Sequence, residues 1–343
     1  MSTAVRYTPT FTTIQAETLA ANHFGISARA TLLPGDRDQN FRLDIEGRPA
    51  FVLKIANPTE ERVTLESQHR MMRTLADRAP DLNVQRVIPG LDGTDLVTTF
   101  DDAGVTHLVR VVTFVPGTPL ASVRPPRSSA LLESLGKSLA ILSMGLDGFD
   151  DPAAHRPFEW ELSTGVETIC QYLPLITEKA RRDLLVALNN RVSTTVVPRL
   201  AECRWSVLHN DANDHNLLVA PAGRVTGIID FGDMVYSVTV ADLAIAVAYA
   251  ILGETAHISV TSQVVHGYQR LQPLRPVERE VLWDLVLLRL GMSVSICANQ
   301  RALQPDNPYL TVSERPAWEA LERLVPRDPR QITEDLFALG EQR

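Results

Sequence analysis

Cysteine is scarce in this chain. Three cysteines occur in 343 residues, at Cys170, Cys203 and Cys297. They are far apart, odd in number and without the close spacing of metal-binding pairs. We therefore expect each of them to be a buried apolar residue, and neither a metal ligand nor a nucleophile.

Basic clusters and export signals are also absent. The formal net charge is −8, and no run of Lys and Arg with interleaved aromatic residues occurs, which argues against nucleic acid as a substrate. No basic segment followed by an apolar one opens the chain, and we expect no stretch that approaches a membrane span. A cytoplasmic enzyme that does not act on membranes is the simplest expectation.

The most informative segment follows a short apolar run at residues 205–208, which predicts a buried strand. The polar stretch after it, H-N-D-A-N-D-H-N, predicts a loop. Two further apolar runs around a Pro-Ala-Gly turn predict a hairpin over residues 217–229. Because a hairpin brings its two ends together, we expect Asn216 and Asp230 to converge.

These residue types in this order suit metal-dependent phosphoryl transfer. One carboxylate, Asp211, would face the attacking hydroxyl, while the amide of Asn216 and the carboxylate of Asp230 would hold Mg²⁺ against nucleotide phosphates. Mg²⁺ prefers such oxygen ligands and completes its shell with water and phosphate. Asp and Asn are also ordinary turn formers, which explains any one of these residues but poorly explains three in this order.

This segment resembles the aminoglycoside phosphotransferase/choline kinase family, whose fold is that of the protein kinases. The family's catalytic loop reads H-x-D with Asn five positions later, and its metal motif reads I-D-x-x-D; here these are His209, Asp211, Asn216, Asp230 and Asp233. The resemblance implies that Asp211 is the catalytic base and that His209 supports the loop. It also implies Asn216 and Asp230 as Mg²⁺ ligands.

The fold implied by this resemblance is α+β and bilobal. A small antiparallel-sheet N-lobe would span residues 1–115 and bind the nucleotide, and a mainly helical C-lobe would span 116–343 and carry catalysis and the acceptor. Strand-like runs up to residue 115 and helical Leu spacing after it agree with this division. A composition of 45% hydrophobic and 22% charged residues is ordinary for such a soluble protein.

Within the family, the loop and the later stretch G-D-M-V-Y-S-V-T-V-A-D-L-A-I-A are most similar to a hydroxylysine kinase-like branch. Position 210 is Asn where much of the wider family has Gly. The branch also occurs fused to class III aminotransferases, which implies a functional link to such an enzyme. Its members use ATP or GTP, so both remain candidate phosphoryl donors.

A kinase-like fold needs a strand lysine that grips the nucleotide phosphates. Lys54 interrupts the apolar run F-V-L-K-I, and a lysine there is costly unless it is paired; the alternative is a lysine on the solvent side of an edge strand. We expect a helix to start at Asn57-Pro58. The order of the family favours Glu66 on that helix as the partner of Lys54.

Upstream, residues 33–43 predict a hairpin whose tip would cover the phosphates. The tip has one Gly, so it is not the Gly-rich loop of protein kinases. Its ending, with Asp38 and Asn40, is similar to the D-x-N-F of the hydroxylysine kinase-like and homoserine kinase-like branches. Backbone N–H groups of a tight loop bind phosphate well, whereas the plainer interpretation is an ordinary polar tip.

The acceptor is less well defined by the sequence. Asp214 and Asp233 add negative charge near Asp211, which favours a cationic acceptor, although both also suit a capping or metal-supporting role. Arg289 and Arg301 are the candidates for binding an acceptor carboxylate. With the resemblance, 5-hydroxylysine or a related amino alcohol is the first candidate.

Other functions remain open at this point. Homoserine, choline or an aminoglycoside or macrolide antibiotic are alternative acceptors within the family. A protein kinase is disfavoured because the Gly-rich loop and an A-P-E segment are missing. A nucleotide-binding pseudokinase would be expected to have lost Lys54, Asp211, Asn216 or Asp230, and the sequence retains all four.

Overall fold

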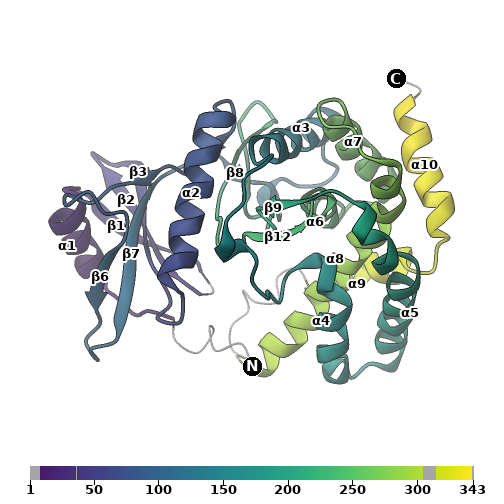
Figure 1. Cartoon of the computed structure of the whole chain (residues 1–343), viewed down its shortest axis with the longest axis horizontal. Coiled ribbons are helices and arrows are strands. Elements are labelled where there is room, and N and C mark those ends of the chain that lie inside the picture. Colours follow the sequence, from purple (N-terminus) through teal and green to yellow (C-terminus); the bar gives the residue numbers. More distant parts are fainter. Residues whose placement is uncertain (1–7, 36, 304–313, 342–343) are drawn as a thin grey trace. The chain divides into compact units, whose positions relative to one another are not determined.

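A computed structural model describes residues 8–35, 37–303 and 314–341 (Figure 1). The chain divides into two compact units, Met1–Pro116 and Gly117–Arg343, here called the first and the second unit. The division falls within the Pro-Gly pair that interrupts the strand pattern of the sequence. Asp36, in the predicted hairpin tip, lies outside the described residues.

The first unit is built on a six-stranded antiparallel sheet. Its strands are β1 (Arg29–Leu33), β2 (Gln39–Ile45), β3 (Arg48–Ile55), β5 (Val87–Ile88), β6 (Val97–Phe100) and β7 (Thr106–Thr113), and β4 (Asn83–Val84) is a further short strand. The order across the sheet is β1-β2-β3-β7-β5, with β6 paired to β7. The predicted small antiparallel-sheet lobe is thereby confirmed.

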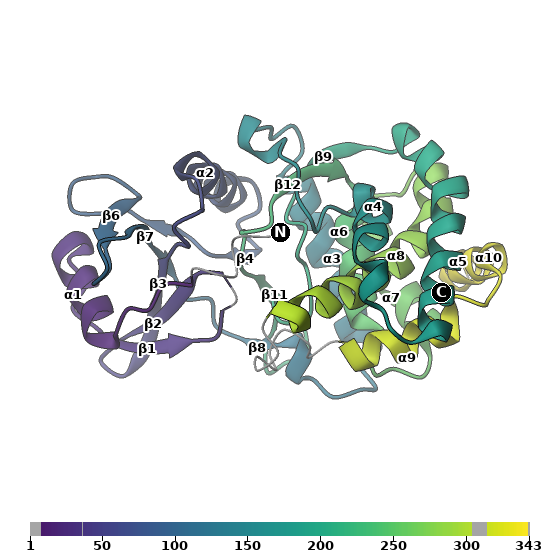
Figure 2. The ribbon, with the colours of Figure 1, turned by 90° about the horizontal axis from the view of Figure 1, so that it is seen from below.

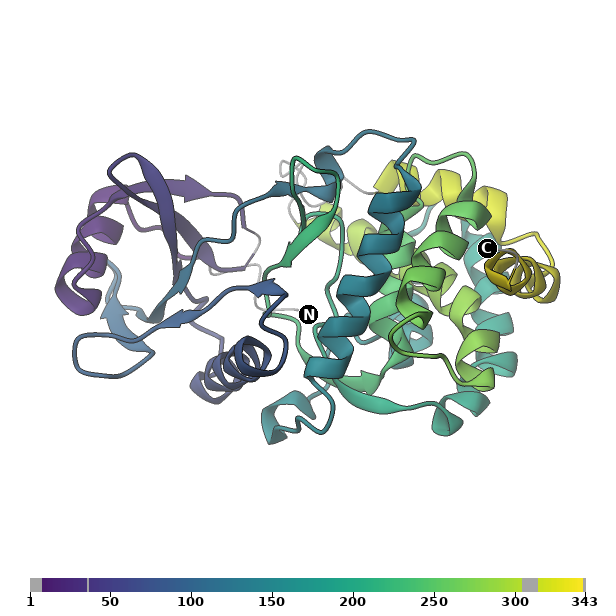
Figure 3. The same cartoon turned by 90° about the horizontal axis from the view of Figure 1, so that it is seen from above.

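Alternate residues of the central strands face opposite sides of this sheet. One face packs on helix α1 (Thr13–Phe24) through Phe41, Leu43, Leu53, Ile55, Val109 and Val111. The opposite face carries Lys54 and Arg110 and lies towards helix α2 (Arg62–Arg78), whose Leu65 joins a small apolar cluster. Figure 3 shows the two helices on opposite sides of the sheet.

Helix α2 starts later than predicted. Asn57 Oδ1 accepts hydrogen bonds from the amide and the hydroxyl of Thr59, at 3.0 and 2.7 Å, so Asn57 closes a turn and does not cap the helix. The helix itself begins at Arg62. The predicted start at Asn57-Pro58 is therefore wrong, because Asn makes similar side-chain contacts in turns and at helix N-termini.

The second unit is mainly helical, as predicted. Its α-helices are α3 (Ser129–Gly145), α4 (Gly165–Tyr172), α5 (Lys179–Thr195), α6 (Val240–Ala250), α7 (His257–Gln269), α8 (Pro276–Leu303), α9 (Glu314–Leu324) and α10 (Pro329–Glu341). Short 3-10 turns are η2 (Leu120–Ser122), η3 (Pro152–Ala154), η4 (Leu162–Thr164), η5 (Leu173–Leu175) and η6 (Val197–Glu202). The strands are β8 (Thr118–Pro119), β9 (Trp205–Leu208), β10 (Leu217–Val219), β11 (Val225–Ile228) and β12 (Val235–Val238).

Helix α8 forms the core of the second unit. It contacts α4, α5, α6, α9 and α10 and runs through the middle of the helical bundle (Figure 2). By length and hydropathy alone it is long and apolar enough to cross a membrane. The expectation that no stretch of the sequence approaches a membrane span is therefore wrong. Its apolar window is entirely buried inside the protein, which is the pattern of a core helix.

Two glycines let helices α3 and α7 approach each other closely (Figure 3). A Cβ on Gly136 would lie 1.9 Å from the carbonyl oxygen of Val264 and 2.6 Å from the amide nitrogen of Tyr268. A Cβ on Gly267 would lie 2.2 Å from the carbonyl oxygen of Glu133. The contact is backbone against backbone, so no side-chain adjustment relieves a methyl group there.

We therefore predict that Gly136→Ala destabilises the protein by roughly 2–3 kcal/mol through overpacking. The sign is informative, because helix propensity alone predicts a gain of about 1 kcal/mol for Gly→Ala within a helix. Denaturant unfolding measures the difference, with Met144→Ala, half exposed on the same helix, as the control. A Gly136→Ala protein as stable as the wild type would contradict the close packing of α3 on α7.

Candidate active site

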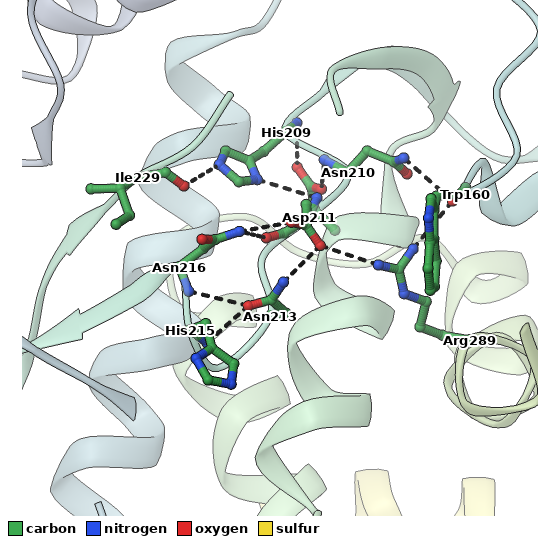
Figure 4. A network of polar contacts seen from close by, with 10 residues as sticks. Trp160, His209, Asn210, Asp211, Asn213, His215, Asn216, Ile229 and Arg289 are labelled. Atoms are coloured by element: carbon green, nitrogen blue, oxygen red, sulfur yellow. Dashed lines mark hydrogen bonds and ion pairs between the residues drawn. The ribbon is translucent and has the colours of Figure 1, made fainter. Parts of the chain in front are cut away.

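Two strand ladders bracket the polar loop 209–216. Strand β9 precedes the loop and β10 follows it. In the first ladder, β10 pairs with β11 through Leu217 and Ile228. In the second, β12 pairs with β9 through Val235 and Leu208. The Ile229 amide donates to the carbonyl oxygen of Asn216 at 3.0 Å. The predicted hairpin therefore holds the end of the loop at Asn216 beside Ile229, the residue before Asp230 (Figure 4).

Asp242 anchors the start of the loop. Its two carboxylate oxygens accept the backbone N–H groups of His209, at 3.1 Å, and of Asn210, at 2.7 Å. The side chain is buried near the beginning of α6, and burial raises its pKa while the hydrogen bonds from these two N–H groups oppose the rise. Asn210 has a φ of 63°, a left-handed conformation that Asn tolerates better than most residues.

His209 links the loop to the end of β11. Its Nδ1 accepts the Asp211 amide at 3.2 Å, so Nε2 carries the proton and donates to the Ile229 carbonyl oxygen at 3.0 Å. The ring also packs edge-on against Phe231, with centroids 4.8 Å apart. These contacts are those expected of a residue that supports the loop.

Asp211 lies at the centre of a polar network (Figure 4). Its Oδ2 accepts a hydrogen bond from Nδ2 of Asn216 at 2.7 Å. Its Oδ1 accepts hydrogen bonds from Nδ2 of Asn213 at 2.9 Å and from Nη2 of Arg289 at 3.2 Å. Burial raises the pKa of Asp211 well above its usual range, and the negative charge of Asp233 adds to the rise, whereas Arg289 opposes it. Raised carboxyl pKa values of this kind gather at functional sites.

Asn213 is a site residue that the sequence interpretation missed. Its Oδ1 accepts the amides of His215 and Asn216, at 2.8 and 3.2 Å, while its Nδ2 reaches Asp211. The side chain thus closes the turn and aims a donor at the carboxylate. The available signal was an Asn two residues after an Asp, which is typical of side-chain-closed turns.

The predicted Mg²⁺ ligands fit that ion by their chemistry. Nδ2 of Asn216 donates to both the backbone and the side chain of Asp211, so its Oδ1 points to the other side of the amide. Asp230 follows Ile229, whose amide is bonded to Asn216. Among the described residues no three His, Cys, Asp or Glu side chains group as a metal site, and an amide with one carboxylate matches the sparse protein ligation of Mg²⁺.

The predicted acceptor residues lie in different surroundings. Asp214 is buried, and Asp233 is buried close enough to raise the pKa of Asp211 by its charge. Oδ1 of Asp214 is buried without a hydrogen-bond partner among the described residues, and burial raises its pKa. Arg289 touches Asp211, whereas Arg301 is 55% exposed and pairs with Glu314 at 2.6 Å.

In the first unit, a row of polar residues crosses the sheet on the α2 face. Asn40, Lys54 and Arg110 are register partners on β2, β3 and β7, and both cations are buried. Oδ1 of Asn40 is buried without a hydrogen-bond partner among the described residues. Asp38 accepts Nη2 of Arg110 at 3.3 Å and the Asn57 amide at 3.2 Å, which ties the hairpin end to the sheet.

Glu66, the predicted partner of Lys54, lies on α2. Its side chain is 43% exposed and lies 3.8 Å from Nη1 of Arg62. Its role beside Lys54 stays a prediction. His69, three residues on, is instead fully buried on this helix, and burial lowers its pKa to about 3.

Fold and site together define a kinase-like phosphotransferase. Residues 29–281 match the profile of the family described as the phosphotransferase enzyme family, so the chain belongs to that family, as its motifs indicated. The chain is 31% identical to hydroxylysine kinase of Mus musculus over 355 aligned residues, covering 96% of this chain and 93% of that protein. The hydroxylysine kinase of Danio rerio is 29% identical, with 93% of each chain covered.

Solved structures share the fold. An amicoumacin kinase in complex with AMP-PNP and Ca²⁺ superposes with a TM-score of 0.67 at 17% identity, covering 93% of this chain and 96% of its own. A microcompartment-associated aminopropanol kinase gives a TM-score of 0.65 at 19% identity, covering 96% and 97%. The predicted protein-kinase-like fold is confirmed, and the chain is a small-molecule phosphotransferase that acts on a hydroxyl group.

We predict that Asp242→Ala lowers the free energy of unfolding by roughly 2–4 kcal/mol, because two buried N–H groups lose their acceptor. Asp242→Asn should cost less, since its amide oxygen still accepts one of them. Denaturant unfolding measures both, and Asp183→Ala is the control because that exposed carboxylate forms a surface ion pair with Lys179 one turn away. Equal stabilities of Asp242→Ala and Asp183→Ala would refute the anchoring role.

Proposed function

We propose that this chain transfers the γ-phosphoryl group of a nucleoside triphosphate to the hydroxyl of a small amino alcohol or hydroxylated amino acid. The first candidate acceptor is 5-hydroxylysine. The observation that carries the proposal is the Asp211 carboxylate, held by Asn213, Asn216 and Arg289 on a loop anchored from beneath by Asp242. Such a held carboxylate suits a group that receives or orients a hydroxyl proton.

The remaining roles follow the chemistry of phosphoryl transfer, which depends mainly on positioning and charge neutralisation. Asn216 and Asp230 would hold Mg²⁺, which when bound would neutralise the negative charge of the nucleotide phosphates. Lys54, with Glu66 as its predicted partner, would steady the nucleotide phosphates. The hairpin end, with Asp38 and Asn40, would cover them, and the tie from Asp38 to Arg110 supports a fixed hairpin.

The acceptor assignment rests on charge and on relatives. The acids around Asp211, namely the buried Asp214 and Asp233 and the partly buried Asp230, favour a cationic acceptor, and an amino group provides such a cation. The curated relatives named hydroxylysine kinase cover almost the whole chain at about 30% identity. Both observations support an acceptor that carries an amine and a hydroxyl.

The phosphoryl donor is either ATP or GTP. Solved structures with this fold are described with AMP-PNP in one case and with GDP in others, and these likenesses show the fold alone. We further propose a cytoplasmic location and a functional link to a class III aminotransferase-type enzyme, as the sequence resemblance implies.

An acceptor panel tests the proposal. Purified protein with Mg²⁺ and either ATP or GTP is assayed by coupled nucleoside diphosphate release against 5-hydroxylysine, 1-amino-2-propanol, homoserine, choline and an aminoglycoside. We predict the highest kcat/KM with 5-hydroxylysine. A preference for choline or an aminoglycoside would leave the reaction standing and replace the acceptor.

Replacing the proposed base tests the chemistry. We predict that Asp211→Asn lowers kcat by about 10²–10⁴-fold, the usual contribution of a positioned base, while nucleotide affinity measured by calorimetry changes little. Asp183→Asn, an exposed change of the same kind, is the control. Near-normal turnover in the Asp211→Asn protein would remove Asp211 from the mechanism.

A further inference from the structure

Arg289 is an unusual residue for its position. It lies in the middle of the core helix α8, between Leu288 and Leu290, and only 1% of its surface is exposed. A buried guanidinium is costly unless it is paired and hydrogen-bonded. Its partners therefore indicate what it does.

Hydrogen bonds from both Nη atoms and the ring of Trp160 hold the guanidinium (Figure 4), while its Nε is buried without a hydrogen-bond partner among the described residues. Nη2 donates to Oδ1 of Asp211 at 3.2 Å, and Nη1 donates to the carbonyl oxygen of Trp160 at 3.2 Å. The guanidinium carbon lies 4.5 Å from the centre of the Trp160 ring and 5.7 Å from that of Tyr249. Stacking of this kind holds the plane of the guanidinium as well as its charge.

The Trp160 carbonyl connects Arg289 to the loop a second time. It also accepts Nδ2 of Asn210, at 3.3 Å. Arg289 is thus tied to Asp211 directly and to the preceding residue through one shared acceptor. The arrangement sets the position of the Asp211 carboxylate relative to the backbone that carries it.

The loop supplies no Lys or Arg of its own. Residues 209–216 read H-N-D-A-N-D-H-N, and the segment after the hairpin adds the acids Asp230 and Asp233. The cation beside Asp211 comes from 78 residues further along the chain. A guanidinium that is itself held in place restricts the orientation of the carboxylate it donates to.

We infer that Arg289 is a positioning residue that orients the Asp211 carboxylate towards the acceptor hydroxyl, and that it is not the ligand of an acceptor carboxylate. The inference rests on the proposed function. The sequence instead indicates Arg289 as a candidate for binding an acceptor carboxylate. The guanidinium is buried, however, and an acceptor carboxylate would have to displace Asp211 to reach it.

Steady-state kinetics of Arg289→Gln and Arg289→Lys test this inference. We expect Arg289→Gln to lower kcat on the order of 10²-fold, the effect of a small misplacement of a reacting group, with the KM for 5-hydroxylysine nearly unchanged. Arg289→Lys should fall between it and the wild type, because Lys keeps the charge but not the planar fork. Arg191→Gln is the matched control, since it breaks a 2.8 Å ion pair to Asp284 of the same helix.

A double variant shows whether Arg289 acts through Asp211. If it does, Arg289→Gln should cause no further loss of kcat in an Asp211→Asn background. Multiplying losses in the double variant would overturn the inference. So would a large rise in the KM for 5-hydroxylysine with unchanged kcat and no effect on 1-amino-2-propanol, which lacks a carboxylate; that pattern identifies a carboxylate ligand.

The unfolding midpoints of the wild type, Arg289→Gln, Asp211→Asn and the double variant give a readout that needs no acceptor. Contact between the two side chains predicts that the midpoint shifts of Arg289→Gln and Asp211→Asn are not additive. If the wild-type protein phosphorylates no acceptor, the proposed function fails. Additive midpoint shifts would then overturn the Arg289 inference separately, and Arg289→Lys replaces Arg289→Gln in this cycle if the Gln variant does not fold.

Discussion

The site depends on the carboxylate of Asp242. A loop that turns through a left-handed residue, as Asn210 does, leaves backbone N–H groups that the strands on either side do not pair. Asp242, in the first turn of α6, accepts hydrogen bonds from two of these N–H groups. One buried acid therefore fixes where the loop begins. His209 fixes the same loop to the end of β11, and Asp211 follows between these two supports.

The same local order explains how much of the site was predictable. Strands β9, β10 and β11 are short apolar runs with clear turn residues between them, so the sequence alone places Asp211, Asn216 and Asp230 at one end of a hairpin. The mainly helical second unit follows from Leu spacing, and the antiparallel first unit from β-branched runs. These features depend on residues close together in the chain.

Features that depend on distant residues were not predictable in the same way. An Arg in the apolar middle of a Leu-rich helix predicts a paired charge, but the partner of Arg289 is set by how α8 packs against loop 209–216. The predicted start of α2 was wrong because Asn57 closes a turn as readily as it caps a helix. Asn213 was overlooked because a turn-forming Asn and a donor to Asp211 have the same sequence signature.

The central claim is phosphoryl transfer from a nucleoside triphosphate to the hydroxyl of a small amine, with Asp211 receiving or orienting the hydroxyl proton. The most direct measurement incubates the protein with Mg²⁺, ATP or GTP and a pool of small metabolites, and follows the products by mass spectrometry. The account predicts that a compound with an amine and a hydroxyl gains one phosphoryl group, and that the Asp211→Asn protein does not produce it at a comparable rate. Binding of nucleotide without phosphorylation of any compound would contradict the account and indicate a nucleotide-binding regulatory protein.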